Sequence, residues 1–315
     1  MALHSHRICI LGGAGFVGRH LSARLVAAGH RVTIITRHRE RHRDLLVLPT
    51  VRLVEGDIHN LTVLRRQFQG QDAVINLVGI LNEQGHDGKG FTRAHVELAS
   101  KVVQACRYSG VTRLLHMSAL HAAPTAPSHY LRTKGLGEQL VLDAGDPFLP
   151  VTVFRPSVIF GAEDSFTNRF AGLLRSVPLV FPLACAQARF QPIYVDDVAQ
   201  AFVAALDNHA TYGQSYDVCG PRVYTLREIV AYLAHILGLR RHIIGLDRRL
   251  SWLQAALLEY FPGKPFSLDN FQSLQLDSVC NAGFPPIFGI KPRFMEDIAP
   301  MYLRRNAHHT DERIR

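Results

Sequence analysis

The chain has 315 residues, of which 47% are hydrophobic and 19% are charged, and its formal net charge at pH 7 is +9. This length allows one large α/β domain or two modest ones, and the composition excludes disordered, collagen-like and coiled-coil classes. No apolar run approaches the ~18 residues that span a bilayer. The first residues also lack the apolar stretch of a secretory signal. We therefore expect a cytoplasmic globular protein.

The five cysteines are scattered, and no two of them form a C-x-x-C pair. They are Cys9, Cys106, Cys185, Cys219 and Cys280. An odd number of widely spaced cysteines favours reduced thiols over a disulfide framework or a zinc site. We expect Cys9 and Cys219 to be inert thiols in apolar strands. The histidine pairs lack carboxylate or cysteine partners at ligand spacing, so we predict no metal site.

Strand-like and helix-like segments alternate through the first half of the chain. The expected strands, which are short and apolar on both faces, are 7–11, 31–36, 51–55, 72–78, 113–117 and 151–155. The expected helices between them are 16–28, 60–70, 92–108 and 129–143. This pattern is typical of the α/β class and predicts a doubly wound parallel Rossmann sheet with helices on both faces.

The regular alternation ends after Gly161, where helices predicted at 197–206 and 226–237 are separated by short strands and prolines. We therefore predict two domains. Residues 1–160 form the dinucleotide-binding Rossmann domain. Residues 161–315 form a smaller substrate or partner lobe, interleaved with the last strands of the sheet.

A short helix in this second lobe carries an apolar stripe that follows two arginines, Arg248 and Arg249. The stripe consists of Leu250, Leu253, Leu257, Tyr260 and Phe261. Packing in a core is the default expectation for such a stripe. A membrane surface, a substrate tunnel and a protein partner are the alternatives that the sequence leaves open.

The turn after the first strand reads Gly12-Gly13-Ala14-Gly15-Phe16-Val17-Gly18. The glycines at 12, 15 and 18 permit a tight turn, close approach of the backbone to a pyrophosphate, and close packing of helix on strand. A pyrophosphate would bind the free N–H groups where the helix begins. A purely structural turn is the alternative, but the position at the first strand–helix junction favours a dinucleotide site.

The residues after the second strand bear on which dinucleotide is bound. Thr36-Arg37-His38 stands where NAD-preferring sites place Asp or Glu. A guanidinium suits a 2′-phosphate through a forked, charge-assisted pair. We therefore expect NADP(H) to be preferred, with NAD(H) as the alternative.

The positive charge of the chain is concentrated near this segment. Residues 1–70 hold 11 Lys and Arg against 4 Asp and Glu. The arginine-rich stretch 37–43 has no interleaved aromatic residues, which a nucleic-acid surface would show. We expect no nucleic-acid partner, and we attribute part of the excess charge to the cofactor site.

Two further strand ends are expected to face the cofactor. Asp57 and Ile58 follow the third strand, where such folds contact the adenine. The fourth strand ends in a run of four residues that would lie along the cofactor, namely Asn76, Leu77, Val78 and Gly79.

Candidate catalytic residues lie on the next strand and helix. Tyr130 and Lys134 are four residues apart, and so lie on one face of a helix. Ser118 ends the preceding strand. A Tyr hydroxyl with a pKa near 10 becomes a usable acid or base when a neighbouring ammonium stabilises the phenolate. We predict that Tyr130 is the acid/base, that Lys134 lowers its pKa and binds the ribose, and that Ser118 orients a substrate carbonyl.

At this point the chain resembles the short-chain dehydrogenase/reductase superfamily, in its extended or atypical branch. The resemblance rests on the glycine turn, the Ser118, Tyr130 and Lys134 set, the segment 155–161 (RPSVIFG) and the segment 192–199 (PIYVDDVA). It implies that Arg155, Pro156, Ser157 and Val158 line the junction between cofactor and substrate, and that Asp196 and Asp197 open a helix of the second lobe. His95 departs from the pattern, because that helix usually offers Asn there.

Within the superfamily, the Tyr130–Lys134 motif with Glu138, together with the segment 163–170, resembles one subgroup. It contains the NADPH-binding accessory subunit of mitochondrial respiratory complex I and its bacterial homologues. The resemblance implies an oxidoreductase or epimerase-like enzyme acting on a small carbonyl, quinone or lipid-like molecule. The alternative is a non-catalytic, NADPH-holding accessory or assembly subunit, peripheral at the inner face of the cytoplasmic membrane and associated with a respiratory complex.

Overall fold

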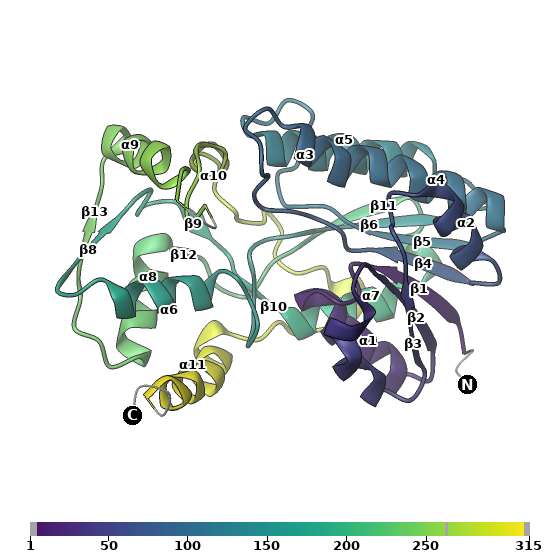
Figure 1. Cartoon of the computed structure of the whole chain (residues 1–315), viewed down its shortest axis with the longest axis horizontal. Helices are drawn as coiled ribbons and strands as arrows, with labels where there is room; N and C mark the ends of the chain where they lie inside the picture. The colour runs from purple at the N-terminus through teal and green to yellow at the C-terminus, as the bar shows by residue number, and fades with distance from the viewer. Residues whose placement is uncertain (1–4, 262–263, 312–315) are drawn as a thin grey trace. The chain divides into compact units, whose positions relative to one another are not determined.

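The computed structural model describes residues 5–261 and 264–311 and divides into two compact units (Figure 1). Unit 1 comprises Met1–Arg155, Asp196–Asp217 and Pro285–Ile290. Unit 2 comprises Pro156–Val195, Val218–Phe284 and Lys291–Arg315. The chain therefore leaves unit 1 after Arg155 and returns to it twice.

Unit 1 is built on a seven-stranded sheet with the order β11-β6-β5-β4-β1-β2-β3. Its strands are β1 (Arg7–Leu11), β2 (Arg31–Thr36), β3 (Val51–Glu55), β4 (Ala73–Asn76), β5 (Arg113–Met117), β6 (Val151–Pro156) and β11 (Gln214–Val218). The strand pairs formed among β1, β2, β3, β4, β5 and β6 are all parallel. Strand order reverses between β1 and β4, which is where doubly wound sheets bind ligands at the carboxyl ends of their strands. The predicted Rossmann architecture is confirmed.

Helices cover both faces of this sheet (Figure 1). One layer contains α2 (Leu61–Phe68), α4 (Leu98–Ser109) and α5 (His129–Asp143), and the other contains α1 (Phe16–Ala27) and α7 (Val195–Ala205). Leu64, Val102 and Val141 of the first layer pack in one buried cluster with side chains of the strands. The predicted start of α2 is confirmed, because the Asn60 side chain accepts hydrogen bonds from the first N–H groups of that helix.

The helix predicted at 92–108 is interrupted near its start. It consists of α3 (Lys89–Thr92), a π-helical turn η2 (Arg93–Glu97) and then α4. A π-helical turn adds a residue to the local repeat and is frequent at functional sites. Here it carries the buried side chain of His95.

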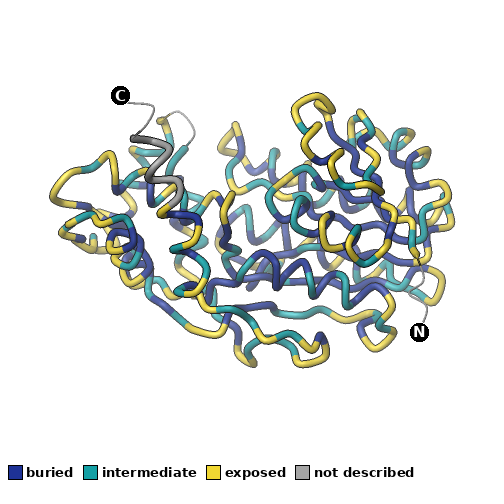
Figure 2. The backbone as a smooth tube through the Cα atoms, turned by 90° about the horizontal axis from the view of Figure 1, so that it is seen from below, coloured by how far each residue is buried: buried dark blue, intermediate teal, exposed yellow. Residues whose placement is uncertain are grey.

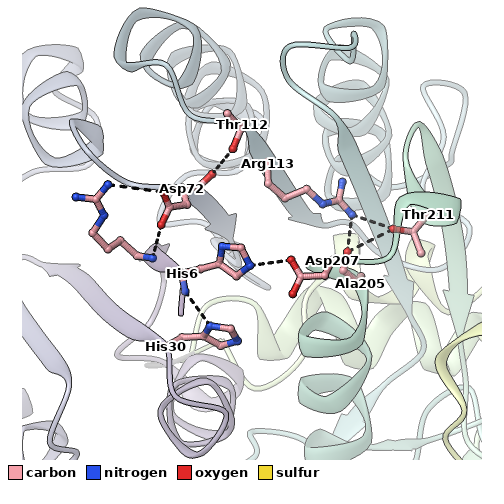
Figure 3. Close-up of polar contacts among 9 residues, drawn as sticks. His6, His30, Asp72, Thr112, Arg113, Ala205, Asp207 and Thr211 are labelled. Carbon is pink, nitrogen blue, oxygen red and sulfur yellow. Dashed lines mark hydrogen bonds and ion pairs between the residues drawn. The ribbon is translucent and has the colours of Figure 1, made fainter. Parts of the chain in front are cut away.

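The amino-terminal edge of the sheet is held by a network of polar contacts (Figure 3). Arg113, the first residue of β5, is buried and donates to the hydroxyl groups of Thr152 (2.6 Å) and Thr211 (2.9 Å) and to the carbonyl of Ala205 (2.8 Å). Its guanidinium also lies 4.4 Å from the centre of the Tyr212 ring. These contacts join two sheet strands to the end of α7, so this edge has a structural role and leaves the carboxyl edge for ligands.

The described part of unit 2 consists of three two-stranded sheets and several helices. Its strands are β7 (Ile159–Phe160), β8 (Val180–Leu183), β9 (Arg189–Phe190), β10 (Ile193–Tyr194), β12 (Tyr224–Thr225) and β13 (His242–Gly245). Its helices are α6 (Thr167–Ser176), α8 (Leu226–Ile236), α9 (Arg248–Leu258), α10 (Leu268–Ser273) and α11 (Met295–Asp311). Leu174, Ile229, Leu233 and Leu303 are among the residues of its core.

The helix that Asp196 and Asp197 open differs from the expectation. The resemblance implied a helix of the second lobe, whereas α7 from Asp196 onward belongs to unit 1. The Arg24 Nε of α1 donates to Asp196 Oδ1 at 2.6 Å. This ion pair between residues far apart in the sequence fixes α7 beside α1.

The expectation of unpaired cysteines is wrong for two of the five. Cys219 and Cys280, both in unit 2, form a disulfide, while Cys9, Cys106 and Cys185 are free. The two cysteines are 61 residues apart in the sequence, but their Cα atoms lie 6.1 Å apart. Only the tertiary fold brings them within bonding reach.

Burial follows the strands of the central sheet, and exposure is concentrated in loops and on outer helix faces (Figure 2). The exposed face of helix α9 is unusual because it is apolar. Its Leu250, Leu253 and Leu257 side chains are 46–59% exposed. The default expectation of core packing for this stripe is therefore wrong. Among the residues that the structure describes, no helix is both long enough and apolar enough to cross a membrane.

Candidate functional site

The glycine turn lies at the carboxyl end of β1, where the strand order of the sheet reverses. Gly12 has φ +78°, a conformation that favours glycine. A Cβ atom at Gly18 would lie 2.4 Å from the Gly12 carbonyl oxygen, so this helix can approach the turn only without a side chain. Gly15 is exposed at the N-cap of α1 and has no side chain to cap it. The first N–H groups of α1 are therefore available for an anionic ligand.

The end of β4 lies against the same turn. A Cβ atom on Gly12 would be 3.3 Å from both the Leu77 carbonyl carbon and the Val78 nitrogen. The Asn76 Oδ1 accepts a hydrogen bond from the Val78 N–H at 3.2 Å, and its Nδ2 donates to His116 Nδ1 at 3.2 Å. The buried Asn76 side chain thus fixes the predicted cofactor segment Asn76–Gly79 beside the turn. This cradle fits the phosphates and nicotinamide end of a dinucleotide.

The basic segment after β2 is tied to the start of α1. Arg37 itself is exposed. Arg19 of α1 donates from Nε to the Ala14 carbonyl at 3.2 Å and forms an ion pair with Asp44 in the 3-10 segment η1 (Arg39–Val47). Arg19 was not among the residues predicted for this site from the sequence. Its position, one residue after Gly18, could have placed it beside the glycine turn.

The residues after β3 have different environments. Asp57 is exposed, and its Oδ1 accepts a hydrogen bond from the His59 N–H at 2.9 Å. Ile58 is half-buried against the core of unit 1. An exposed carboxylate at the carboxyl edge of β3 agrees in position with the predicted adenosine contact, which stays a prediction.

The predicted catalytic residues lie just after the carboxyl end of β5 and in the first two turns of α5. Lys134 is buried, and its Nζ donates to the Met117 carbonyl at 2.5 Å, next to Ser118. Tyr130 lies one turn earlier on the same helix, with its ring 6.2 Å from that of Phe91 in an edge-on contact. Ser128 caps this helix by accepting from the Leu131 N–H at 3.1 Å.

Ser118 is the least satisfied member of the set. Its residue exposure is 3%, and its backbone N–H donates to the Phe154 carbonyl at 2.7 Å. Its Oγ has no hydrogen-bond partner among the residues that the structure describes. A buried hydroxyl without a partner costs about 1–3 kcal/mol. Buried hydroxyls without a partner are uncommon in folded proteins, so the Ser118 Oγ is available for a hydrogen bond to a ligand.

Burial changes the charge of the groups around Ser118. Desolvation lowers the pKa of Lys134 to about 8, and the Glu138 carboxylate acts in the opposite direction. Desolvation together with the Lys134 ammonium lowers the pKa of His116 to about 3. At neutral pH the site therefore holds one ammonium beside neutral imidazoles.

His95 is a second feature that sequence reasoning did not assign. Its Nε2 accepts from the Ile80 N–H at 3.2 Å, so its Nδ1 carries the proton and donates to the Thr133 hydroxyl at 2.9 Å. Its ring lies 5.6 Å from that of Tyr130 in an edge-on contact. Burial lowers the pKa of His95 to about 2, with a smaller contribution from Lys134. His95 is therefore a neutral support for Tyr130 and for the loop after β4.

Arg155, assigned to the cofactor junction by resemblance, is engaged within unit 1. Its Nε donates to Glu138 Oε1 at 2.6 Å, and its Nη1 lies 3.8 Å from Asp217 Oδ1. In unit 2, Pro156 is buried, the Ser157 hydroxyl donates to the Ser278 carbonyl at 2.8 Å, and Val158 packs on the core. The polar side chains of this segment have partners in the fold, and their contacts with cofactor stay predictions.

Residues 8–219 match the NAD dependent epimerase/dehydratase family. The chain is 28% identical to the NADH-ubiquinone oxidoreductase 40 kDa subunit of Neurospora crassa, over 79% of this chain and 65% of that protein. It is 30% identical to the mouse NADH dehydrogenase [ubiquinone] 1 alpha subcomplex subunit 9, over 94% and 79%. It is 29% identical to the ceramide reductase of Caulobacter vibrioides, over 74% and 71%.

Among solved structures, gox2253 has the same fold, with a TM-score of 0.75 at 18% identity over 96% of this chain and 99% of that one. The glycine turn, the reversed strand order and the matched segment 8–219 agree. The chain belongs to the NAD dependent epimerase/dehydratase family.

Proposed function

We propose that this protein is an NADP(H)-dependent reductase of the carbonyl group of an apolar small molecule. The observation that carries the proposal is the buried hydroxyl of Ser118, which has no partner among the described residues and follows Met117, the residue whose carbonyl binds Lys134 Nζ. One relative is named a ceramide reductase, which supports a lipid-like carbonyl as the substrate class.

The roles follow from the geometry of the site. Ser118 Oγ donates a hydrogen bond to the substrate oxygen and thereby gains the partner that the fold does not supply. Tyr130 donates its proton to the same oxygen as the carbonyl becomes a hydroxyl. The Lys134 ammonium, held by the Met117 carbonyl, stabilises the phenolate that remains. A bound nicotinamide dinucleotide supplies the hydride.

The cofactor would be held by the turn and strand ends already described. Gly12, Gly15 and Gly18 allow the pyrophosphate to reach the N–H groups of Phe16 and Val17 at the start of α1. The other contacts come from Asp57, Ile58, Asn76, Leu77, Val78 and Gly79, with Tyr130 and Lys134 at the ribose. The exposed guanidinium of Arg37 follows β2, where it would pair with a 2′-phosphate.

The catalytic proposal is tested with Tyr130→Phe, which removes the proton donor and retains the ring. NADPH oxidation is measured with long-chain ketones and quinones, and NADPH binding is measured by fluorescence. We expect kcat to fall about 100-fold or more, while the Kd for NADPH rises by no more than about ten-fold through the lost hydrogen bond to the ribose. Absence of turnover by the wild-type protein with every carbonyl tested, or equal rates for the variant, contradicts the proposal.

The cofactor preference is tested with Arg37→Glu, which places a carboxylate where the 2′-phosphate would bind. A charge-assisted hydrogen bond contributes about 1.5–3 kcal/mol, so the affinity for NADPH should fall at least about ten-fold. The affinity for NADH should be unchanged or higher. Arg43→Glu is the control, because Arg43 forms an ion pair with Glu40. An equal loss of both dinucleotides in Arg37→Glu refutes the preference.

A second candidate function is supported by the relatives named as subunits of mitochondrial NADH dehydrogenase. In that case the protein holds NADPH without turning it over and associates with a membrane respiratory complex. This candidate predicts NADPH that copurifies, exchanges slowly and persists unchanged in Tyr130→Phe. Rapid exchange together with substrate turnover excludes it.

A further inference from the structure

The helix α9 of unit 2 exposes the face that a helix normally buries. Leu250, Leu253 and Leu257 follow one another at helical spacing and are 49%, 46% and 59% exposed. Tyr260, one turn beyond Leu257, is 83% exposed. We call these four residues the leucine face.

The opposite face of the same helix is the buried one, although it carries only small side chains. Ser251 and Ala255 are fully buried, at 1% and 0% exposure. The Ser251 hydroxyl accepts from the Cys185 N–H at 3.1 Å and donates to the Leu246 carbonyl at 3.3 Å. These bonds fix the rotation of α9 on unit 2, so the leucine face cannot turn inward without breaking them.

The charge around the leucine face is positive. Residues 240–264 contain five Arg and Lys against Asp247 and Glu259, and the helix itself, Arg248–Leu258, has no acidic residue. Asp247 is used as the N-cap, since its side chain accepts from the Leu250 N–H at 2.8 Å. Arg248 and Arg249 are exposed in the first turn.

The combination favours a lipid surface over a protein partner. An exposed apolar face on a helix that begins with arginines and carries an exposed Trp is typical of helices that lie in the membrane interface. Trp252 is 51% exposed on this helix. Eleven residues span about 16 Å, which is too short to cross a bilayer but sufficient to lie along one.

We propose that the leucine face of α9 docks this protein on an anionic bilayer surface, with Trp252 at the level of the lipid headgroups and Arg248 and Arg249 on their phosphates. The proposal rests on unit 2 alone. It holds whether the site in unit 1 turns over its cofactor or only holds it.

Trp252 is the only tryptophan in the chain and therefore reports directly on docking. The full chain is mixed with vesicles of phosphatidylcholine, with or without phosphatidylglycerol, and followed by tryptophan fluorescence and by sedimentation. We expect a blue shift and co-sedimentation with the anionic vesicles, both weakened by salt. No shift and no sedimentation with either vesicle overturns the proposal.

Two pairs of substitutions assign the docking to this face. Leu253→Gln with Leu257→Gln should weaken vesicle binding at least about ten-fold, because the lost burial is apolar. Arg248→Gln with Arg249→Gln should weaken binding to anionic vesicles roughly ten-fold and remove most of its salt dependence. Val47→Gln with Phe148→Gln is the matched control in unit 1, where these residues are 83% and 86% exposed, and it should bind as the wild type does.

Unchanged circular dichroism and NADPH affinity show that the variants fold. Because they replace exposed side chains only, we expect no loss of either. Equal weakening in the control pair overturns the proposal. The proposal is also overturned if the wild type binds no vesicles but sediments as a dimer, and if Leu253→Gln with Leu257→Gln dissociates that dimer. The leucine face would then be covered by a second copy of the chain.

Discussion

The ionisable side chains nearest Ser118 owe their charge state to burial. His95 and His116 have pKa values of about 2 and about 3, and desolvation is the largest cause in both. Lys134 keeps its proton below a pH of about 8. In the proposed mechanism the ammonium would therefore act on Tyr130 without competition from a charged imidazole. Raising the pH above about 8 would then remove the charge proposed to stabilise the phenolate.

These histidines make the stability of unit 1 depend on pH. In the unfolded chain an imidazole titrates near 6.5, so below that pH the unfolded state binds protons that folded His95 and His116 do not. Their contribution is fully present above pH 6.5 and is lost as the pH falls. At about pH 5 the loss is about 2 kcal/mol for each histidine.

Denaturant unfolding at about pH 7.5 and about pH 5 measures this loss. In His95→Gln the difference in the free energy of unfolding should be smaller than in the wild type by about 2 kcal/mol. His235→Gln, which changes an exposed histidine of unit 2, should leave the difference unchanged. An unaltered pH dependence in His95→Gln would show that His95 is not held neutral.

At the scale of elements, the site depends on how closely α5 packs on the π-helical turn η2. Gly137 of α5 faces this turn, and a Cβ atom there would lie 2.3 Å from the backbone carbonyl oxygen of His95. The same contact keeps the His95 ring near Tyr130 and Thr133. The glycine is therefore required for the approach of two backbones rather than for flexibility.

Replacing Gly137 with Ala tests this contact. We expect a loss of about 1–3 kcal/mol in the free energy of unfolding, because the backbone cannot yield as a side chain would. Gly172→Ala in α6 is the matched control, since its added Cβ meets no described atom within 4 Å beyond its chain neighbours and its own helix backbone. This control should stabilise the protein by about 0.5–1 kcal/mol through helix propensity. Equal effects of the two substitutions would contradict close packing of α5 on η2.

At the scale of the whole molecule, the chain alternates between two units. Each unit is therefore built from segments that lie far apart in the sequence and are held together by contacts within that unit. Arg155, where the chain first leaves unit 1, is bonded to Glu138. In unit 2, the disulfide between Cys219 and Cys280 joins the segment after β11 to the segment after α10. The disulfide closes the chain between the two cysteines into one covalent loop.

Reduction of this disulfide should destabilise unit 2 by about 2–4 kcal/mol, because the unfolded chain regains the freedom of a long loop. The unfolding midpoint with and without reductant measures the effect. Cys280→Ser should be as unstable as the reduced protein and insensitive to reductant. A non-reducing peptide map in which Cys219 and Cys280 are both free thiols would contradict the pairing.

Local patterns predicted the Rossmann unit well. The bounds of β1, β2, β3, β5 and α5 agree with those expected from the sequence. Each is set by short-range signals, namely short buried runs of apolar residues in the strands and the N-cap Ser128 in α5. The helix at 92–108 was predicted without its π-helical turn, because one inserted residue leaves the apolar periodicity almost unchanged.

The sequence by itself determined the alternation of strands and helices that predicts a parallel sheet, the glycine turn, and the spacing that places Tyr130 and Lys134 on one helix face, because each of these patterns is local. The tertiary structure alone decided the pairing of Cys219 with Cys280, the unpartnered hydroxyl of Ser118 and the outward direction of the leucine face. Those features depend on which distant segments pack together, and burial, partners and pKa values exist only once that packing is formed.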